Sequence, residues 1–91
     1  MEYDFDFSKE ENLILKETRK ISFEDVIEAV KKGKILADLE HAGKKYSGQR
    51  LLIIQIKKYV YVVPYIINIK AKKIFLKTIY PSRKLTKKYL K

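Results

Sequence analysis

The sequence predicts a small α+β domain in which two N-terminal helices and a short C-terminal helix pack against an antiparallel sheet. Two observations support this fold class. Capped, amphipathic helical patterns fill the first third of the chain, whereas runs of β-branched and aromatic residues fill most of the remainder. Since 91 residues is near the lower end of the usual domain size, we expect residues 1–91 to form a single domain.

The first elements are a strand and a helix. Residues 3–7 alternate aromatic with acidic side chains, which is typical of a short, half-buried edge strand. Ser8 and Glu11 have the spacing of a capping box, in which the hydroxyl and the carboxylate each accept a hydrogen bond from a free backbone N–H group. A helix is therefore predicted from there towards Lys20.

The second helix has the clearest pattern in the chain. Ser22 can cap it, Ile21 can pack against its first turn, and Gly33 can close it. Its apolar residues recur at the i, i+3, i+4 and i+7 positions of one helical face, namely Phe23, Val26, Ile27 and Val30.

After this helix the pattern changes to that of strands. The predicted segments are a strand over 35–40, a loop over 42–48, strands over 50–56 and 59–67, and a strand over 73–80. The two middle strands would form a hairpin that turns at Lys57 and Lys58. Pro64 cannot donate a backbone hydrogen bond, so we expect an edge position or a bulge near it.

A short basic helix should close the chain. Pro81 ends the last strand, and Ser82 can cap a helix in which Leu85 and Tyr89 would face inward. Arg83 would lie in the first turn, where free backbone donors and the helix dipole favour a phosphate.

The charge is divided unevenly along the chain. The net charge is +10, from 21 Lys and Arg against 11 Asp and Glu. All 11 acids lie within residues 1–43, and residues 44–91 hold 14 bases and no acid. Such an asymmetry indicates a surface that meets a polyanion, either nucleic acid or an anionic membrane.

The composition excludes several kinds of chemistry. The absence of Cys excludes disulfides, thiolate catalysis and Cys-ligated metals, and a single His leaves no histidine metal cluster, so we expect neither a metal nor another cofactor. The acidic N-terminus is unlike a secretory signal, and the longest apolar run, residues 60–67, is too short to span a bilayer. We therefore expect a cytoplasmic protein without a membrane partner.

A basic, tyrosine-containing segment is the strongest functional feature. Residues 77–91 combine cations that can track phosphates with aromatic rings that can stack bases, each stack being worth about 1–3 kcal/mol. The residues are Lys77, Arg83, Lys84, Lys87, Lys88 and Lys91, with Tyr80 and Tyr89. A merely soluble helix with Tyr89 in the core is the alternative interpretation. Binding is favoured because no acid interrupts the segment.

His41 is the one side chain with a pKa ordinarily near neutrality. It lies where a strand meets a Gly-containing loop, a usual place for functional groups, although an ordinary surface histidine is the commoner outcome. Asp38 and Glu40 share a strand face and are conceivable as a carboxylate pair. Without a third acid in a metal-ligand pattern, solvated strand charges are the better interpretation.

Several short pieces of the sequence, in order and spacing, are similar to one protein family. They are Tyr3 to Asp6 with Lys9 to Asn12, Ile21 to Val26, Asp38 with His41, Arg50 at a strand start, and Thr78 to Thr86. Over nearly its whole length the chain resembles the BrnT-type toxins of bacterial toxin–antitoxin pairs, a branch of the RelE-like ribonuclease toxins. It departs from the family at Gly48-Gln49, where a Glu is often found, and at Pro81-Ser82, where small residues precede the family's Arg.

The resemblance implies a RelE-like fold and a ribonuclease that cleaves RNA, with mRNA the expected substrate, without a metal. Attack of the 2′-OH on the adjacent phosphate needs a base, a cation for the transition state and an acid for the 5′-oxygen. By position, Arg50 and Arg83 would hold the phosphate charge and His41 would act as acid or base. Lys77 or Tyr80 would support them, as inferred from the basic strand and helix junction.

The resemblance also implies partners. A ribbon-helix-helix antitoxin would neutralise the toxin and would form an oligomer with it on operator DNA. The remaining candidate RNA-binding residues are Lys57, Lys58, Lys84, Lys87, Lys88 and Tyr89. Two other classes of function stay open: a non-catalytic nucleic-acid-binding module, and a subunit whose basic surface only binds an acidic antitoxin segment.

Overall fold

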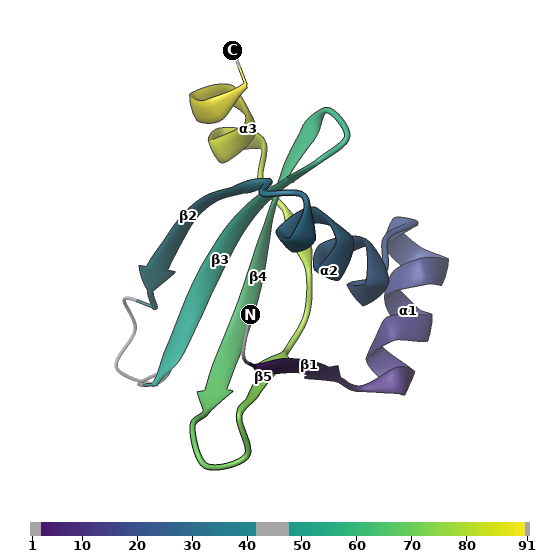
Figure 1. The fold of residues 1–91 in the computed structure, drawn as a ribbon. Helices are drawn as coiled ribbons and strands as arrows, with labels where there is room; N and C mark the ends of the chain where they lie inside the picture. The colour runs from purple at the N-terminus through teal and green to yellow at the C-terminus, as the bar shows by residue number, and fades with distance from the viewer. Residues whose placement is uncertain (1–2, 42–47, 91) are drawn as a thin grey trace.

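The computed structural model, which describes residues 3–41 and 48–90, has one six-stranded mixed sheet and three helices in the described part of the chain (Figure 1). The strands are β1 (Asp4–Phe7), β2 (Ile35–Glu40), β3 (Gln49–Ile56), β4 (Tyr59–Asn68), β5 (Lys73–Leu76) and β6 (Tyr80–Pro81). The helices are α1 (Lys9–Arg19), α2 (Phe23–Lys31) and α3 (Arg83–Tyr89). The predicted α+β class is confirmed, whereas most of the predicted loop over 42–48 lies outside the described residues.

The sheet is mixed, which corrects the prediction of an antiparallel one. The strand order is β1-β5-β4-β3-β2, with β6 also paired to β4, and β1 runs parallel to β5. A parallel pair needs a long crossover connection, and both N-terminal helices lie within that connection. The pairing joins residues far apart in sequence, so local alternation could not reveal it.

The helices begin where their caps predict. Ser22 and Asp25 form a full capping box at α2, and the Ser82 hydroxyl accepts a hydrogen bond from the Leu85 N–H group at α3. At α1 only half of the expected box forms. Ser8 accepts from the Glu11 N–H group, but the Glu11 carboxylate accepts a hydrogen bond from the Thr78 hydroxyl instead.

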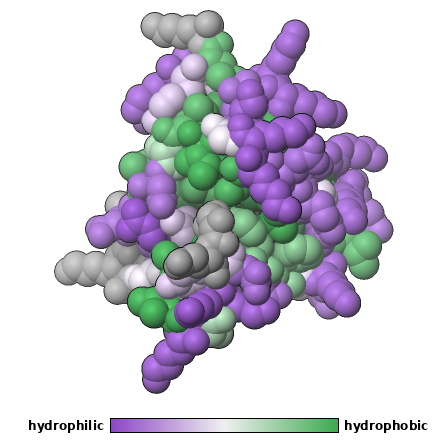
Figure 2. All heavy atoms as spheres, in the orientation of Figure 1, coloured by the Kyte–Doolittle hydropathy of each residue, from purple (hydrophilic) through white to green (hydrophobic). Residues whose placement is uncertain are grey.

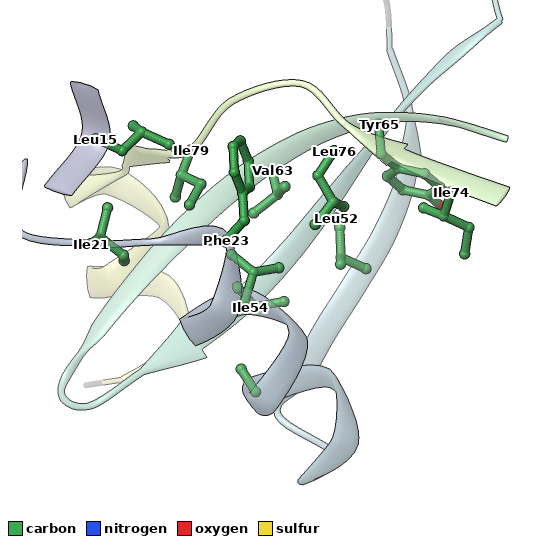
Figure 3. Close-up of a cluster of buried hydrophobic side chains, with 12 residues drawn as sticks. Leu15, Ile21, Phe23, Leu52, Ile54, Val63, Tyr65, Ile74, Leu76 and Ile79 are labelled. Atoms are coloured by element: carbon green, nitrogen blue, oxygen red, sulfur yellow. The ribbon is translucent and has the colours of Figure 1, made fainter. Parts of the chain in front are cut away.

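Two hydrophobic clusters lie on opposite faces of the sheet. On the helical face, defined by Leu52, Ile54 and Val63, side chains pack against α1 and α2 around the fully buried Phe23 (Figure 3). On the open face, defined by Ile53, Val60 and Val62, Leu85 and Leu90 of the α3 segment cover one end. In Figure 2, hydrophilic side chains cover much of the part that holds α1 and α2, with apolar surface between them.

The centre of the sheet is the β3–β4 hairpin. It turns at Lys57 and Lys58, as predicted, and Lys57 adopts a left-handed backbone with φ of 57°. Pro64 lies in β4, an interior strand, which corrects the expected edge position. Pro64 nevertheless lies between two ladders on the same side of β4. Residues from Tyr65 onwards pair with β5, and residues up to Val62 pair with β6. The missing N–H group is therefore tolerated at a break in the pairing.

The predicted strand over 73–80 is broken in the middle. β5 ends at Leu76, the fully buried Ile79 enters the core of the helical face, and β6 then begins at Tyr80. The Arg19 guanidinium donates a hydrogen bond to the Ile79 carbonyl and so holds α1 against this segment. Among the described residues, no helix is long and apolar enough to cross a membrane.

Candidate functional site

The last helix presents its cations to solvent and its leucines to the sheet. Leu85 and Leu90 pack on the open face, and Thr86 ties the helix to β4 by accepting a hydrogen bond from the Val60 N–H group at 3.0 Å. Tyr89 is 36% exposed, so the expectation that it faces inward is wrong; Leu90, which follows the last residue of the helix, packs on the open face instead.

The exposed side of α3 carries four of the predicted residues. Arg83, Lys84, Lys87 and Lys88 are all exposed, and the Lys88 ammonium lies 5.4 Å from the centre of the Tyr89 ring. This contact keeps a positive charge next to the exposed ring, so α3 offers phosphate-binding and aromatic groups side by side. Lys91, the remaining cation of the segment, lies outside the described residues.

Lys77 and Tyr80 lie along one flank of β4, next to this helix. The Lys77 N–H group donates to the Pro64 carbonyl at 2.8 Å, and Tyr80 pairs with Val62. The Ser82 N–H group continues the row by donating to the Val60 carbonyl at 3.0 Å. The structure thus brings three predicted residues, Lys77, Tyr80 and Arg83, onto one edge of the open face.

The hairpin turn adds two further cations at the α3 end of the sheet. Lys57 and Lys58 are exposed and line a hollow of about 420 Å³ together with Arg19 and Lys20, and with one acid, Asp25. The four basic side chains come from the hairpin and from the end of α1. They extend the positive surface beyond α3 around that end of the molecule.

Arg50 lies elsewhere, at the opposite end of the sheet and on the helical face. Its Nε donates to the Asp38 carboxylate at 3.0 Å and its Nη2 to the Asp38 carbonyl at 3.2 Å. The Tyr65 hydroxyl donates to the same carboxylate at 2.7 Å. Asp38 is therefore a paired group rather than the free, solvated strand charge that its sequence position indicated.

The electrostatics of this cluster reflect the pairing. The hydrogen bond to Asp38 raises the pKa of Arg50 above its usual value. Burial, followed by the hydrogen bond to Asp38, raises the pKa of Tyr65 to about 12. Arg50 is charged and Tyr65 is protonated at neutral pH, which are the states that hold the carboxylate, and both pKa shifts favour these states further.

An apolar hollow of about 430 Å³ opens beside the cluster. Its walls come from the helical face, α2 and the ends of β1 and β4, and they consist of Tyr3, Phe5, Val30, Ile35, Asp38, Leu52, Tyr65, Ile67, Ile69 and Ile74. Ile69 is 73% exposed at its rim. Sequence analysis missed Tyr65 and this hollow, because both depend on the pairing of β2, β3 and β4.

His41 follows the end of β2 and is not brought to the α3 end. Its N–H group donates to the Gln49 carbonyl at 3.2 Å, and its side chain is half-buried. Across the sheet, His41 neighbours Gln49 of β3, Gln49 pairs with Ile66 of β4, and Tyr80 of β6 pairs with Val62 of β4. His41 and Tyr80 are therefore three strand spacings apart across the sheet and four residues apart along β4. Their Cα atoms are roughly 20 Å apart.

The predicted residues therefore fall into two groups. The larger group lies on the open face and at its α3 end and consists of Lys57, Lys58, Lys77, Tyr80, Arg83, Lys84, Lys87, Lys88 and Tyr89. Arg50 and His41 lie towards the far end of the sheet. In the described ranges 3–41 and 48–90, no three His, Cys, Asp or Glu side chains are grouped as metal ligands.

Comparison with known proteins adds no relative. No family model matches the sequence, and neither the curated proteins nor the solved structures contain a significant match.

Proposed function

We propose that this chain is a ribonuclease toxin with a RelE-like fold, of the BrnT type, that binds RNA on the α3 end of its open face. The observation that carries the proposal is the set of unpaired cations there. Within the described residues from 48 onwards, Arg50 is the only Lys or Arg within 4.0 Å of a carboxylate. The other cations, including the four of α3, keep their charge available for phosphate.

The proposed chemistry is a transfer within the RNA. The 2′-oxygen attacks the adjacent phosphorus, the 2′-proton leaves to a base, and the 5′-oxygen departs with a proton from an acid. Arg83, exposed beside Tyr80, stabilises the negative charge that grows on the phosphoryl oxygens. Lys77 and Tyr80, on the same flank of β4, are the groups proposed to move the protons.

Arg50 and His41 have less support as catalytic residues. The Arg50 guanidinium is held by Asp38, so we propose that it stabilises the end of the sheet. His41 stays a candidate acid or base, but its distance from Tyr80 favours the flank of β4 for proton transfer. A comparison of His41→Ala with Tyr80→Phe in the same cleavage assay assigns the role.

The basic surface supports RNA as a partner, whereas the antitoxin is what the resemblance to BrnT-type toxins implies. RNA, expected to be mRNA in the cytoplasm, is the substrate. A ribbon-helix-helix antitoxin with an acidic segment would compete for the cations and would join the toxin in an oligomer on operator DNA.

The testing experiment is cleavage of RNA by the purified protein, with the new ends mapped, in the presence and absence of ribosomes and of EDTA. We expect cleavage that EDTA leaves intact and that Arg83→Ala reduces by about 10²- to 10³-fold. Lys31→Ala is the matched control, because Lys31 is an exposed cation of α2 with no ion pair to any described residue. Cleavage abolished by EDTA, or full activity in Arg83→Ala, contradicts the proposed mechanism.

A non-catalytic nucleic-acid-binding module is the second candidate. One observation favours it: Arg50 is occupied by Asp38 and His41 lies far from Tyr80, which leaves fewer groups for catalysis. In that case RNA binds and stays intact, and His41→Ala changes nothing.

A further inference from the structure

A regular row of side chains runs along the flank of β4 on the open face. Every second residue of β4 faces a residue of the segment that runs from β5 to α3. Along β5 and its end, Asn68 pairs with Lys73, Ile66 with Phe75, and Pro64 with Lys77. Further on, Val62 pairs with Tyr80, and Val60 with Ser82, which precedes Arg83. The first four neighbours thus alternate cation, aromatic, cation and aromatic; the fifth is Ser82, and the cation Arg83 follows it as the first residue of α3. Eight residues of strand separate its ends, which is about 26 Å.

Burial shows which way these side chains face. Ile74 and Leu76 of β5 are buried in the core of the helical face, and side chains alternate along a strand, so Lys73, Phe75 and Lys77 belong to the opposite face. Phe75 is 36% exposed and Tyr80 is 38% exposed, and Ile66, the neighbour of Phe75, is 37% exposed. Two aromatic rings therefore stand open to solvent, about 13 Å apart along β4, with Lys77 between them.

We infer that this row is a track for single-stranded RNA, in which Phe75 and Tyr80 stack unpaired bases and Lys73, Lys77 and Arg83 contact the phosphates. The inference rests on the proposed function and adds the strandedness of the substrate, its path, and Phe75 as a binding residue. A base within a duplex is stacked on both sides, so an aromatic platform selects an unpaired strand.

The charges around the row favour RNA over an apolar protein partner. None of its three cations has a carboxylate of a described residue within 4.0 Å, so each is available to meet a phosphate. The outer side of β5 is bordered by β1, where Asp4 pairs with Lys73 and Asp6 with Phe75. These two acids repel phosphate, so we expect the phosphate contact at Lys73 to be weaker than those at Lys77 and Arg83.

The test uses the absence of Trp from the chain. Phe75→Trp places one indole on the track, and Leu13→Trp places one on α1, where Leu13 is 60% exposed, as the matched control. The probe is a single-stranded RNA of about 8 nucleotides, within the usual range of single-strand sites. Its 2′-O-methyl groups prevent cleavage. Binding is followed in parallel by anisotropy of labelled RNA.

We expect saturable quenching of the Phe75→Trp emission by the single strand, much weaker quenching by the same sequence as a duplex, and none in the control. Phe75→Ala should weaken binding by roughly tenfold while the circular dichroism spectrum is retained. Two results together would overturn the track: RNA binding by anisotropy without quenching of the Trp emission, and wild-type affinity in Phe75→Ala. The proposal that the protein binds RNA elsewhere on its basic surface would stand.

Two further outcomes are decisive. If the wild-type protein binds no RNA by anisotropy, the proposed function and the track fail together. If Phe75→Trp responds to an acidic peptide and not to the single strand, the row is a protein-docking surface instead.

Discussion

The two faces of the sheet use the same strands for different purposes. On the helical face, alternate residues of β3, β4 and β5 are buried under α1 and α2, and even the polar Asn12 is satisfied, because it bonds to both Glu24 and the Phe23 backbone. On the open face, α3 covers one end and leaves Phe75, Ile66 and Tyr80 exposed. Strand alternation thus places the core of the helical face and the exposed residues proposed to bind RNA one residue apart in sequence.

The largest expected effect lies on the helical face. Phe23 is fully buried and stacks on Phe7 with ring centres 4.9 Å apart, so Phe23→Ala should lower the free energy of unfolding by about 3–5 kcal/mol. Urea denaturation measures it. RNA affinity, measured where the variant is still folded, should be unchanged. A loss of affinity in the folded variant would show that the two faces are coupled.

The next effect belongs to the open face. Replacing Lys84, Lys87 and Lys88 together with Gln should weaken RNA binding by about ten- to a hundredfold at low salt. The slope of log affinity against log salt should fall by about 0.7 for each phosphate that the protein no longer neutralises. Stability should barely change, because the three side chains are exposed. An unchanged salt slope would remove α3 from the RNA surface.

A smaller effect tests the polar cluster on the helical side. Tyr65→Phe removes the hydrogen bond to Asp38 and should cost about 1 kcal/mol of stability. The pKa of Tyr65 is raised to about 12 in the folded state, from an ordinary value of 10. The folded state therefore holds its proton more tightly, and this contribution is present below pH 10 and lost as the pH rises from 10 towards 12.

The measurement is the free energy of unfolding of both proteins from about pH 8 to about pH 12. Tyr65→Phe should show a flatter decline between pH 10 and 12 than the wild type, with RNA affinity at neutral pH unchanged. Parallel curves would mean that Tyr65 titrates alike in the folded and unfolded states.

The smallest effect sharpens the border of the open face. Asp6→Asn removes a negative charge next to Phe75, and the amide oxygen can still accept the hydrogen bond from the Phe7 N–H group. RNA affinity should rise by less than about tenfold at low salt, and the gain should shrink as salt screens the charge. Glu17→Gln, an exposed change on α1, is the control; an equal gain there would indicate only the net charge.

Sequence analysis predicted what local pattern determines. The serine caps placed the starts of all three helices, and the β-branched run placed the β3–β4 hairpin with its turn at Lys57. It could not foresee that β1 pairs in parallel with β5, or that Ile79 interrupts the last strand to fill the core, because both depend on contacts distant in sequence. Tertiary packing decided them.

The candidate site was predicted in the same partial way. The charge asymmetry and the cluster of Lys77, Tyr80 and Arg83 are local in sequence, and the structure keeps them on one flank. Arg50 acquires a neighbour, Asp38, only when β2 pairs with β3, so its ion pair was invisible. The exposure of Phe75 could have been predicted from the sequence. Its neighbours Ile74 and Leu76 are apolar and side chains alternate along a strand, so burial of those two places Phe75 on the opposite face.

The parallel pairing of β1 with β5 has a consequence for how the chain is made. Asp4 pairs with Lys73, so during synthesis β1 has no partner strand until β5 has left the ribosome. Helices can form locally in the meantime, but closure of this edge joins contacts of high sequence separation and should come late in folding. Phe5 and Phe7 then pack against the core beside Ile74 and Leu76. The complete sheet can therefore form only after β5 has been synthesised.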